Sequence, residues 1–130
     1  MKNVLLVDDD GVFNFISTKT LERMGITDDI HTALNGEQAL DLFSGYYRDT
    51  NSVPDVILLD LNMPVLDGFG FLKAFKQLDL PAKDRIKIIV VSSSLHPDDI
   101  RQAEALGANG YLSKPLTAQG LTEALETCQN

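Results

Sequence analysis

The sequence has little of what disulfide-bonded, membrane-spanning or nucleic-acid-binding proteins need. Its 130 residues include one cysteine, Cys128, so no disulfide can form within the chain. The apolar run Val4–Val7 is ended by three aspartates, and no run approaches the length of a membrane span or a secretory leader. Lysine and arginine total 11 against 19 acidic residues, and the resulting net charge of −8 repels nucleic acid and anionic membranes. We therefore expect a cytoplasmic protein that binds neither.

The composition is that of one folded domain. A chain of 130 residues with 44% hydrophobic composition can bury one continuous core. It has no internal repeat, low-complexity tract or linker of domain size. We expect residues 1–130 to form a single domain with no second domain attached.

Short apolar runs alternate with amphipathic stretches along the chain. Five runs predict strands, at Val4–Val7, Ile30–Leu34, Val56–Leu59, Ile86–Val91 and Gly110–Leu112. The first, third and fourth are continuously apolar, which is typical of strands covered by helices on both faces. The alternation predicts right-handed crossovers and therefore an α/β fold with a doubly wound parallel sheet.

The stretches between the strands predict helices. Phe13, Ile16, Thr20 and Met24 recur at helical spacing before Gly25, which predicts an apolar face and a left-handed stop. Further helices are predicted after Asn35-Gly36, with Phe69, Leu72 and Phe75 on one face, from Pro97, and after a Thr117 cap. Gly70 inside one of them costs about 1 kcal/mol relative to alanine. The polar stretch Gly45–Pro54 predicts an exposed loop, with Tyr46 and Tyr47 closing the preceding helix.

Polar residues follow four of the five predicted strands. Asp8, Asp9 and Asp10 follow the first, Asp60 the third, Ser92, Ser93 and Ser94 the fourth, and Ser113 and Lys114 the fifth. Ligands of open α/β sheets bind beyond the carboxyl ends of the strands, so these residues share one edge. If the first and third strands are neighbours, about 5 Å apart, Asp8 or Asp9 faces Asp60.

This set of residue types suits a phosphoryl group and a hard metal ion. Clustered carboxylates either raise a pKa or hold a cation, and a few oxygen ligands suit Mg²⁺. Lys114 would neutralise a bound anion, Ser92 could donate a hydrogen bond to it, and the Asp60 carboxylate could be the in-line nucleophile. Asp10 is most simply a helix cap, and Tyr111 a core or half-buried strand aromatic.

Four motifs resemble the receiver domains of bacterial two-component response regulators, and stand-alone chemotaxis regulators among them. They are VLLVDDD at Val4–Asp10, VILLDLNMPVLDGFGFL at Val56–Leu72, VVSSS at Val90–Ser94 and GANGYLSKPL at Gly107–Leu116. The resemblance implies a flavodoxin-like strand order 2-1-3-4-5. It also implies a protein that takes a phosphoryl group from a histidine kinase or phosphotransfer protein and works as a switch rather than an enzyme. Without an output domain, we expect its output to go through protein contact, through phosphotransfer to another protein or through effects on a kinase.

The resemblance also implies a role for each site residue. Asp60 matches the phospho-acceptor, Asp9 a direct Mg²⁺ ligand, and Asp8 an acid that reaches the metal through water. Asn62 matches the residue whose backbone carbonyl binds the metal.

Three further positions match residues that bind the phosphoryl group or respond to it. Lys114 matches the lysine that pairs with the phosphate, and its bond to Pro115 is often cis in this family. Ser92 and Tyr111 match a coupled switch pair. We expect partners to read the face formed by the helix after Pro97, the last strand and the last helix, with Ile100, Ala103, Tyr111 and the segment Leu116–Leu125.

Three other classes of protein fit the sequence less well. A Mg²⁺-dependent phosphatase with an aspartate nucleophile is the nearest, but it needs a second carboxylate two residues after the nucleophile, where this chain has Asn62. A flavin-binding protein needs a glycine- and hydroxyl-rich phosphate loop after the first strand, where this chain has three aspartates. A receiver that binds partners without phosphorylation would not need the complete set of acids, hydroxyl and lysine.

Overall fold

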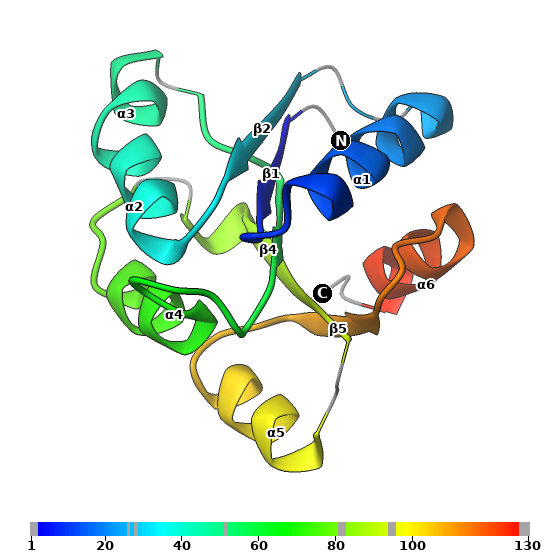
Figure 1. Ribbon diagram of the computed structural model, residues 1–130. Coiled ribbons are helices and arrows are strands. Elements are labelled where there is room, and N and C mark those ends of the chain that lie inside the picture. The colour runs from blue at the N-terminus through cyan, green and yellow to red at the C-terminus, as the bar shows by residue number, and fades with distance from the viewer. Residues whose placement is uncertain are drawn as a thin grey trace.

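The computed structural model describes residues 3–25, 27, 29–50, 52–80, 83–93 and 96–127 (Figure 1). Five parallel strands form one sheet in the order β2-β1-β3-β4-β5. They are β1 (Asn3–Val7), β2 (Asp29–Ala33), β3 (Val56–Leu59), β4 (Lys87–Ser92) and β5 (Gly110–Ser113). The predicted doubly wound α/β fold and strand order are confirmed, with strand boundaries within one residue of those expected. Asn51, Ser94 and Cys128 lie outside the described residues.

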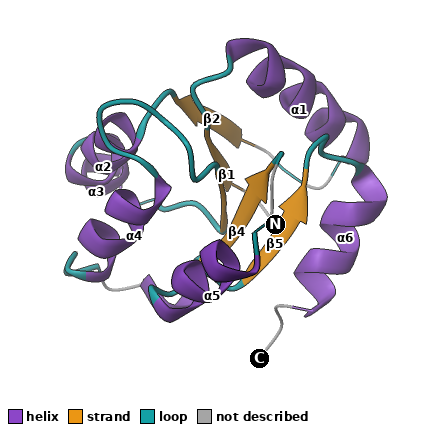
Figure 2. Cartoon of the chain, turned by 60° about the horizontal axis from the view of Figure 1, so that its bottom comes forward, coloured by secondary structure: helices purple, strands orange, loops and turns teal. Residues whose placement is uncertain are grey.

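Helices cover both faces of the sheet (Figures 1 and 2). They are α1 (Gly11–Met24), α2 (Gly36–Ser44), α3 (Tyr46–Thr50), α4 (Gly68–Lys76), α5 (Pro97–Ala105) and α6 (Ala118–Thr127), with a 3-10 turn η1 (Lys83–Arg85). Helices α1 and α6 lie on one face, and α2, α3, α4 and α5 lie on the other. None of the helices in the described part of the chain has the length and apolar character that a membrane crossing requires.

The sheet separates two hydrophobic cores, because successive side chains of a strand point to opposite faces. In β1, Leu5 and Val7 pack with residues of α2 and α4, whereas Val4 and Leu6 pack with Leu21 of α1 and Leu121 of α6. Strands β3 and β4 divide their side chains in the same way. These central strands need apolar residues at every position, which explains the continuous runs in the sequence.

Helix α1 starts and stops where expected, and its buried face includes polar side chains as well as apolar ones. The Asp10 carboxylate caps it by accepting from the backbone amides of Val12 and Phe13, and Gly25 ends it with a φ of 66°. The buried residues are Asn14, Ser17, Thr20 and Leu21, whereas Ile16 is 53% exposed. Of the four residues expected on one face, Thr20 is buried and Phe13 and Met24 pack against the core, so the prediction was wrong for Ile16 alone. The buried polar residues Asn14 and Ser17 were not expected from the sequence. The Asn14 side chain is accommodated there by donating to the carbonyl of Asp8 at 2.9 Å.

The stretch Gly45–Pro54 is not the exposed loop that the sequence predicted. It contains α3, and Tyr47 is 1% exposed, with its ring centroid 4.9 Å from that of Phe43. Tyr46 stays at the surface, where its ring meets that of His31 on the edge strand β2. Tyr47 is the buried side chain of α3, and the other residues of this short helix are exposed. The polar composition of the stretch therefore gave no sign that it is anchored in the core.

Two glycines of α4 allow the loop after β3 to pack against the start of this helix. A Cβ atom on Gly68 would lie 2.5 Å from the backbone oxygen of Asp60, too close for any side chain. A Cβ on Gly70 would collide with the side chain of Leu66. The glycine that weakens the helix in isolation therefore leaves room for the Leu66 side chain to pack against α4.

Candidate functional site

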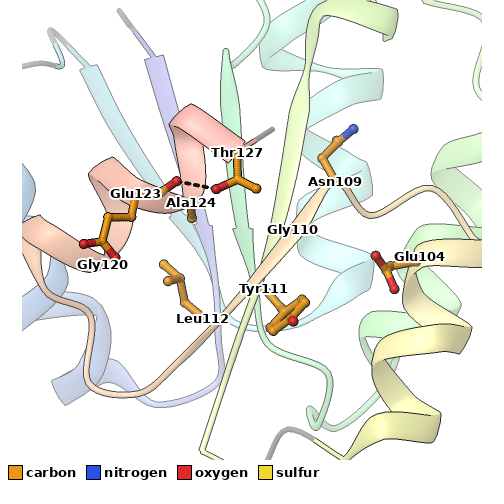
Figure 3. A pocket seen from close by; sticks show the side chains of 9 residues that line it. All are labelled: Glu104, Asn109, Gly110, Tyr111, Leu112, Gly120, Glu123, Ala124 and Thr127. Atoms are coloured by element: carbon orange, nitrogen blue, oxygen red, sulfur yellow. Dashed lines mark hydrogen bonds between the residues drawn. The ribbon is translucent and has the colours of Figure 1, made fainter. Parts of the chain in front are cut away.

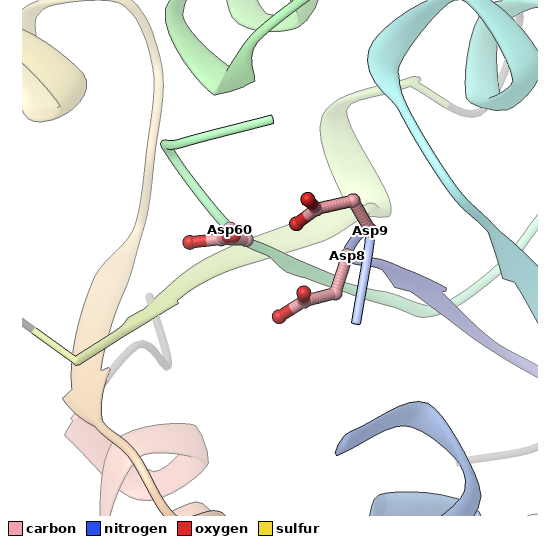
Figure 4. Close-up of side chains that lie close together, drawn as sticks. All are labelled: Asp8, Asp9 and Asp60. Carbon is pink, nitrogen blue, oxygen red and sulfur yellow. The ribbon is translucent and has the colours of Figure 1, made fainter. Parts of the chain in front are cut away.

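Three carboxylates meet at the carboxyl edge of the sheet (Figure 4). Asp8 and Asp9 follow β1, and Asp60 follows β3, which is the neighbour of β1 in the sheet. One oxygen from each carboxylate lies within 4.8 Å of the other two. The sequence-based expectation that these acids face one another is confirmed.

Asp8 is fixed on several sides. It is 2% exposed, its Oδ1 accepts from the Asp10 amide at 2.9 Å, and its own amide donates to Ala33 of β2. Its carbonyl accepts from Nδ2 of Asn14. Sequence reasoning missed Asn14, because nothing in the spacing of α1 shows that it reaches back to the acidic loop. Asp9, by contrast, is exposed and free to face solvent.

Lys114 provides the positive charge of the site. Its Nζ lies 2.6 Å from Oδ2 of Asp8 and 3.9 Å from Oδ2 of Asp60, so the ammonium rests against the first acid while remaining near the second. Its backbone amide donates to the carbonyl of Ser92, which ties the end of β5 to the end of β4. The bond from Lys114 to Pro115 is cis.

Asp60 is destabilised in its ionised form. Its residue is 6% exposed, and its backbone amide donates to the carbonyl of Val7. Burial, with a smaller contribution from the charge of Asp8, raises the pKa of Asp60 from 3.8 to about 6, although the Lys114 ammonium and a backbone hydrogen bond from Asn62 oppose the rise. Lys114 therefore lies near two of the three carboxylates, and the clustered oxygens of all three fit a hard divalent cation.

The remaining predicted residues lie at different depths. Ser92, the last residue of β4, is 1% exposed, and Asn62, two residues beyond Asp60, is exposed. Tyr111 on β5 is 49% exposed, so of the two expected environments it has the half-buried one and is not a core residue. Since β5 is an edge strand with a single neighbouring strand, its side chains are covered less completely than those of β4. Tyr111 lies away from the carboxylates, in a pocket beside α5 and α6 (Figure 3).

Comparison with known proteins agrees with the fold. The model of the response regulator receiver domain matches residues 4–126, so the chain belongs to this family.

Individual relatives extend the match over almost the whole chain. A probable methanogenesis regulatory protein, FilR2, from Methanothrix harundinacea is 32% identical, and the alignment covers 95% of this chain and 78% of the relative. The crystal structure of a two-component response regulator from Cytophaga hutchinsonii superimposes with a TM-score of 0.86, 33% identity and coverage of 98% and 96%. The chemotaxis protein CheY4 of Vibrio cholerae gives a TM-score of 0.79, 30% identity and coverage of 99% of both chains. The predicted resemblance to chemotaxis regulators is confirmed.

Proposed function

We propose that this receiver domain takes a phosphoryl group onto Asp60 from a histidine kinase or a phosphotransfer protein, and that the modified domain signals by changing shape. The observation that carries the proposal is the meeting of Asp8, Asp9 and Asp60 within 4.8 Å, with the Lys114 ammonium beside them. Phosphoryl transfer needs positioning and charge neutralisation more than covalent chemistry, and this site offers both.

The residues present fit Mg²⁺. The carboxylates of Asp9 and Asp60 and the backbone carbonyl of Asn62 would hold it directly, with Asp8 acting through water. When bound, the ion would neutralise charge on the phosphoryl oxygens.

The chain's own residues account for the transfer. A carboxylate oxygen of Asp60 attacks the phosphorus in line, and the bond from phosphorus to the donor's imidazole nitrogen breaks. The electron pair stays on the imidazole, which takes up a proton. Lys114, 3.9 Å from Asp60, needs only a small displacement from Asp8 to pair with a phosphoryl oxygen. Ser92 would move inward to donate a hydrogen bond to another phosphoryl oxygen.

Removing the exposed carboxylate of Asp9 should weaken Mg²⁺ binding more than removing any other acid of the site. We expect Asp9→Ala to lower the affinity for Mg²⁺ by about tenfold or more, because few protein ligands meet an ion that keeps several waters. Isothermal or NMR titration measures the affinity. Asp41→Ala, which removes an equally exposed carboxylate from α2, is the matched control and should leave the affinity unchanged. Undiminished binding in Asp9→Ala would show that another carboxylate is the main ligand.

We further propose that the modified domain is read at the face formed by α5, β5 and α6. The exposed ring of Tyr111 lies there in a pocket of about 350 Å³ between the two helices, which Glu104 and Glu123 flank (Figure 3). A phosphoryl group adds about −1.5 to −2 charge beside Ser92, which can donate to it only by moving inward. The space that Ser92 leaves would let Tyr111 rotate inward from its present exposed position, and the face would change.

NMR spectra recorded with Mg²⁺ and beryllofluoride, a phosphoryl mimic, test this switch. We expect shift changes at Ile100, Ala103 and Tyr111 as well as near Asp60, because a difference of a few kcal/mol between two states shifts their populations by orders of magnitude. Ser92→Ala should abolish the distant changes and keep the local ones. If the distant changes persist in that variant, or never occur, output through the loop Met63–Asp67 becomes the better hypothesis.

The same site favours a switch over an enzyme that acts on other substrates. A phosphatase of this plan needs an acid at the position of Asn62, and an amide cannot exchange a proton there. We therefore propose a protein partner rather than nucleic acid or membrane, in keeping with the net charge of −8, and a cytoplasmic location.

A further inference from the structure

An aromatic ring lies against the lysine of the site. Nζ of Lys114 lies 4.4 Å from the ring centroid of Phe13, which belongs to the first turn of α1 although Lys114 follows β5. The place of Phe13 is well defined. Its amide donates to the capping carboxylate of Asp10 at 3.1 Å, and its side chain packs at the edge of the core between the sheet, α1 and α6.

The ring occupies a side of the ammonium that water would otherwise solvate. An ammonium group has three N–H donors and no acceptor. Asp8 contacts Nζ at 2.6 Å, Asp60 lies at 3.9 Å, and only 20% of the lysine side chain is exposed. The negative face of an aromatic ring attracts a cation, more strongly where water is excluded. The ammonium is therefore confined between two carboxylates and a ring.

We propose that Phe13 is a positioning residue for phosphoryl binding, acting through Lys114. By holding the ammonium at the carboxylates, the ring reduces the reorganisation needed when a phosphoryl group arrives on Asp60. The inference rests on the proposed pairing of Lys114 with that group, and it adds a residue of α1 to the site.

The same helix provides a matched control. The ring of Phe15 also lies near a lysine, with Nζ of Lys19 at 5.4 Å from its centroid, but Phe15 is 64% exposed and Lys19 points into solvent beside Glu22. Substituting either phenylalanine removes one ring from α1, and only one of the two rings contacts the site.

The affinity for beryllofluoride in the presence of Mg²⁺, measured by fluorine NMR, tests the role. We expect Phe13→Leu to weaken binding by about 3- to 30-fold, the range that a partly desolvated cation–π contact supplies. Phe13→Met, which keeps the length of the side chain without the ring, should do the same and serves if the leucine variant folds poorly. Phe13→Tyr should restore the affinity to within about twofold, because it keeps the ring face. Phe15→Leu should leave the affinity unchanged.

The possible results distinguish a positioning role of Phe13 from a purely packing role, and they distinguish failure of this inference from failure of the proposed function. If Phe13→Leu and Phe13→Met lower the melting temperature but bind beryllofluoride as the wild type does, Phe13 only packs, and the inference is wrong. The inference also fails if Phe13→Tyr is as weak as the leucine variant. Failure of the wild-type protein to bind beryllofluoride would overturn the proposed function, and this role with it.

Discussion

Replacing Asp60 by asparagine should reduce phosphorylation by acetyl phosphate to background. Asp60 is buried and follows β3, the central strand of the sheet, and an amide lacks the carboxylate oxygen proposed to attack phosphorus. Intact-protein mass spectrometry measures the fraction of chains that carry the added phosphoryl group. The wild-type protein should be labelled with Mg²⁺ and not when a chelator removes divalent metal.

Asp41→Asn is the control for this experiment, because it makes the same chemical change on the exposed surface of α2. It should be labelled as fully as the wild type. Equal labelling of Asp60→Asn and wild type would place the phosphoryl group on another residue, and labelling of the wild type in chelator would remove the need for a metal.

The same substitution should make the metal-free protein more stable near neutral pH. The folded protein raises the pKa of Asp60 from 3.8 to about 6, so folding disfavours the ionised carboxylate. The contribution of Asp60 to stability is therefore most favourable below pH 3.8, where its carboxyl is protonated in both the folded and the unfolded protein, and it falls as the pH rises through 6. This rise in pKa corresponds to about 3 kcal/mol, which is the upper limit of the stability gained by Asp60→Asn at pH 7.

Urea denaturation across this pH range measures the gain. The difference in free energy of unfolding between Asp60→Asn and wild type should shrink towards zero as the pH falls below 3.8. Adding Mg²⁺ at neutral pH should stabilise the wild type more than the variant, because the ion neutralises the carboxylates that folding brings together. The difference in free energy of unfolding should therefore become smaller. A variant that is less stable than the metal-free wild type at pH 7 would contradict this account of Asp60.

The fold could be predicted because the apolar pattern of each central strand shows that both of its faces are buried. Val56–Leu59 matches β3 residue for residue, since a central strand that faces two cores tolerates no polar position. Helices were harder to orient, because a helix can bury polar residues that find a backbone partner, as Asn14 does with Asp8. Tyr47 shows a further limit, because the burial of one ring in a polar stretch depends on contacts with residues distant in the sequence, such as His31 of β2, whose ring centroid lies 5.8 Å from that of Tyr47.

The candidate site could be assembled from the sequence because all its residues stand at strand ends, and parallel strands bring those ends together. The sequence could not rank the contacts among them. That the ammonium of Lys114 lies closer to Asp8 than to Asp60, and that Phe13 lies against it, depends on side-chain positions that no spacing rule specifies. The outward position of Tyr111 likewise depends on how far α5 and α6 cover an edge strand.

The order of the strands divides the molecule into parts that can vary independently. All the residues proposed for chemistry follow β1, β3, β4 or β5, and β2 at the opposite edge supplies none of them. The short helix α3 packs beside that edge, where the ring centroid of its Tyr47 lies 5.8 Å from that of His31 on β2. Insertions or sequence changes in this half can therefore alter the size and stability of the domain while leaving the proposed phosphoryl site intact.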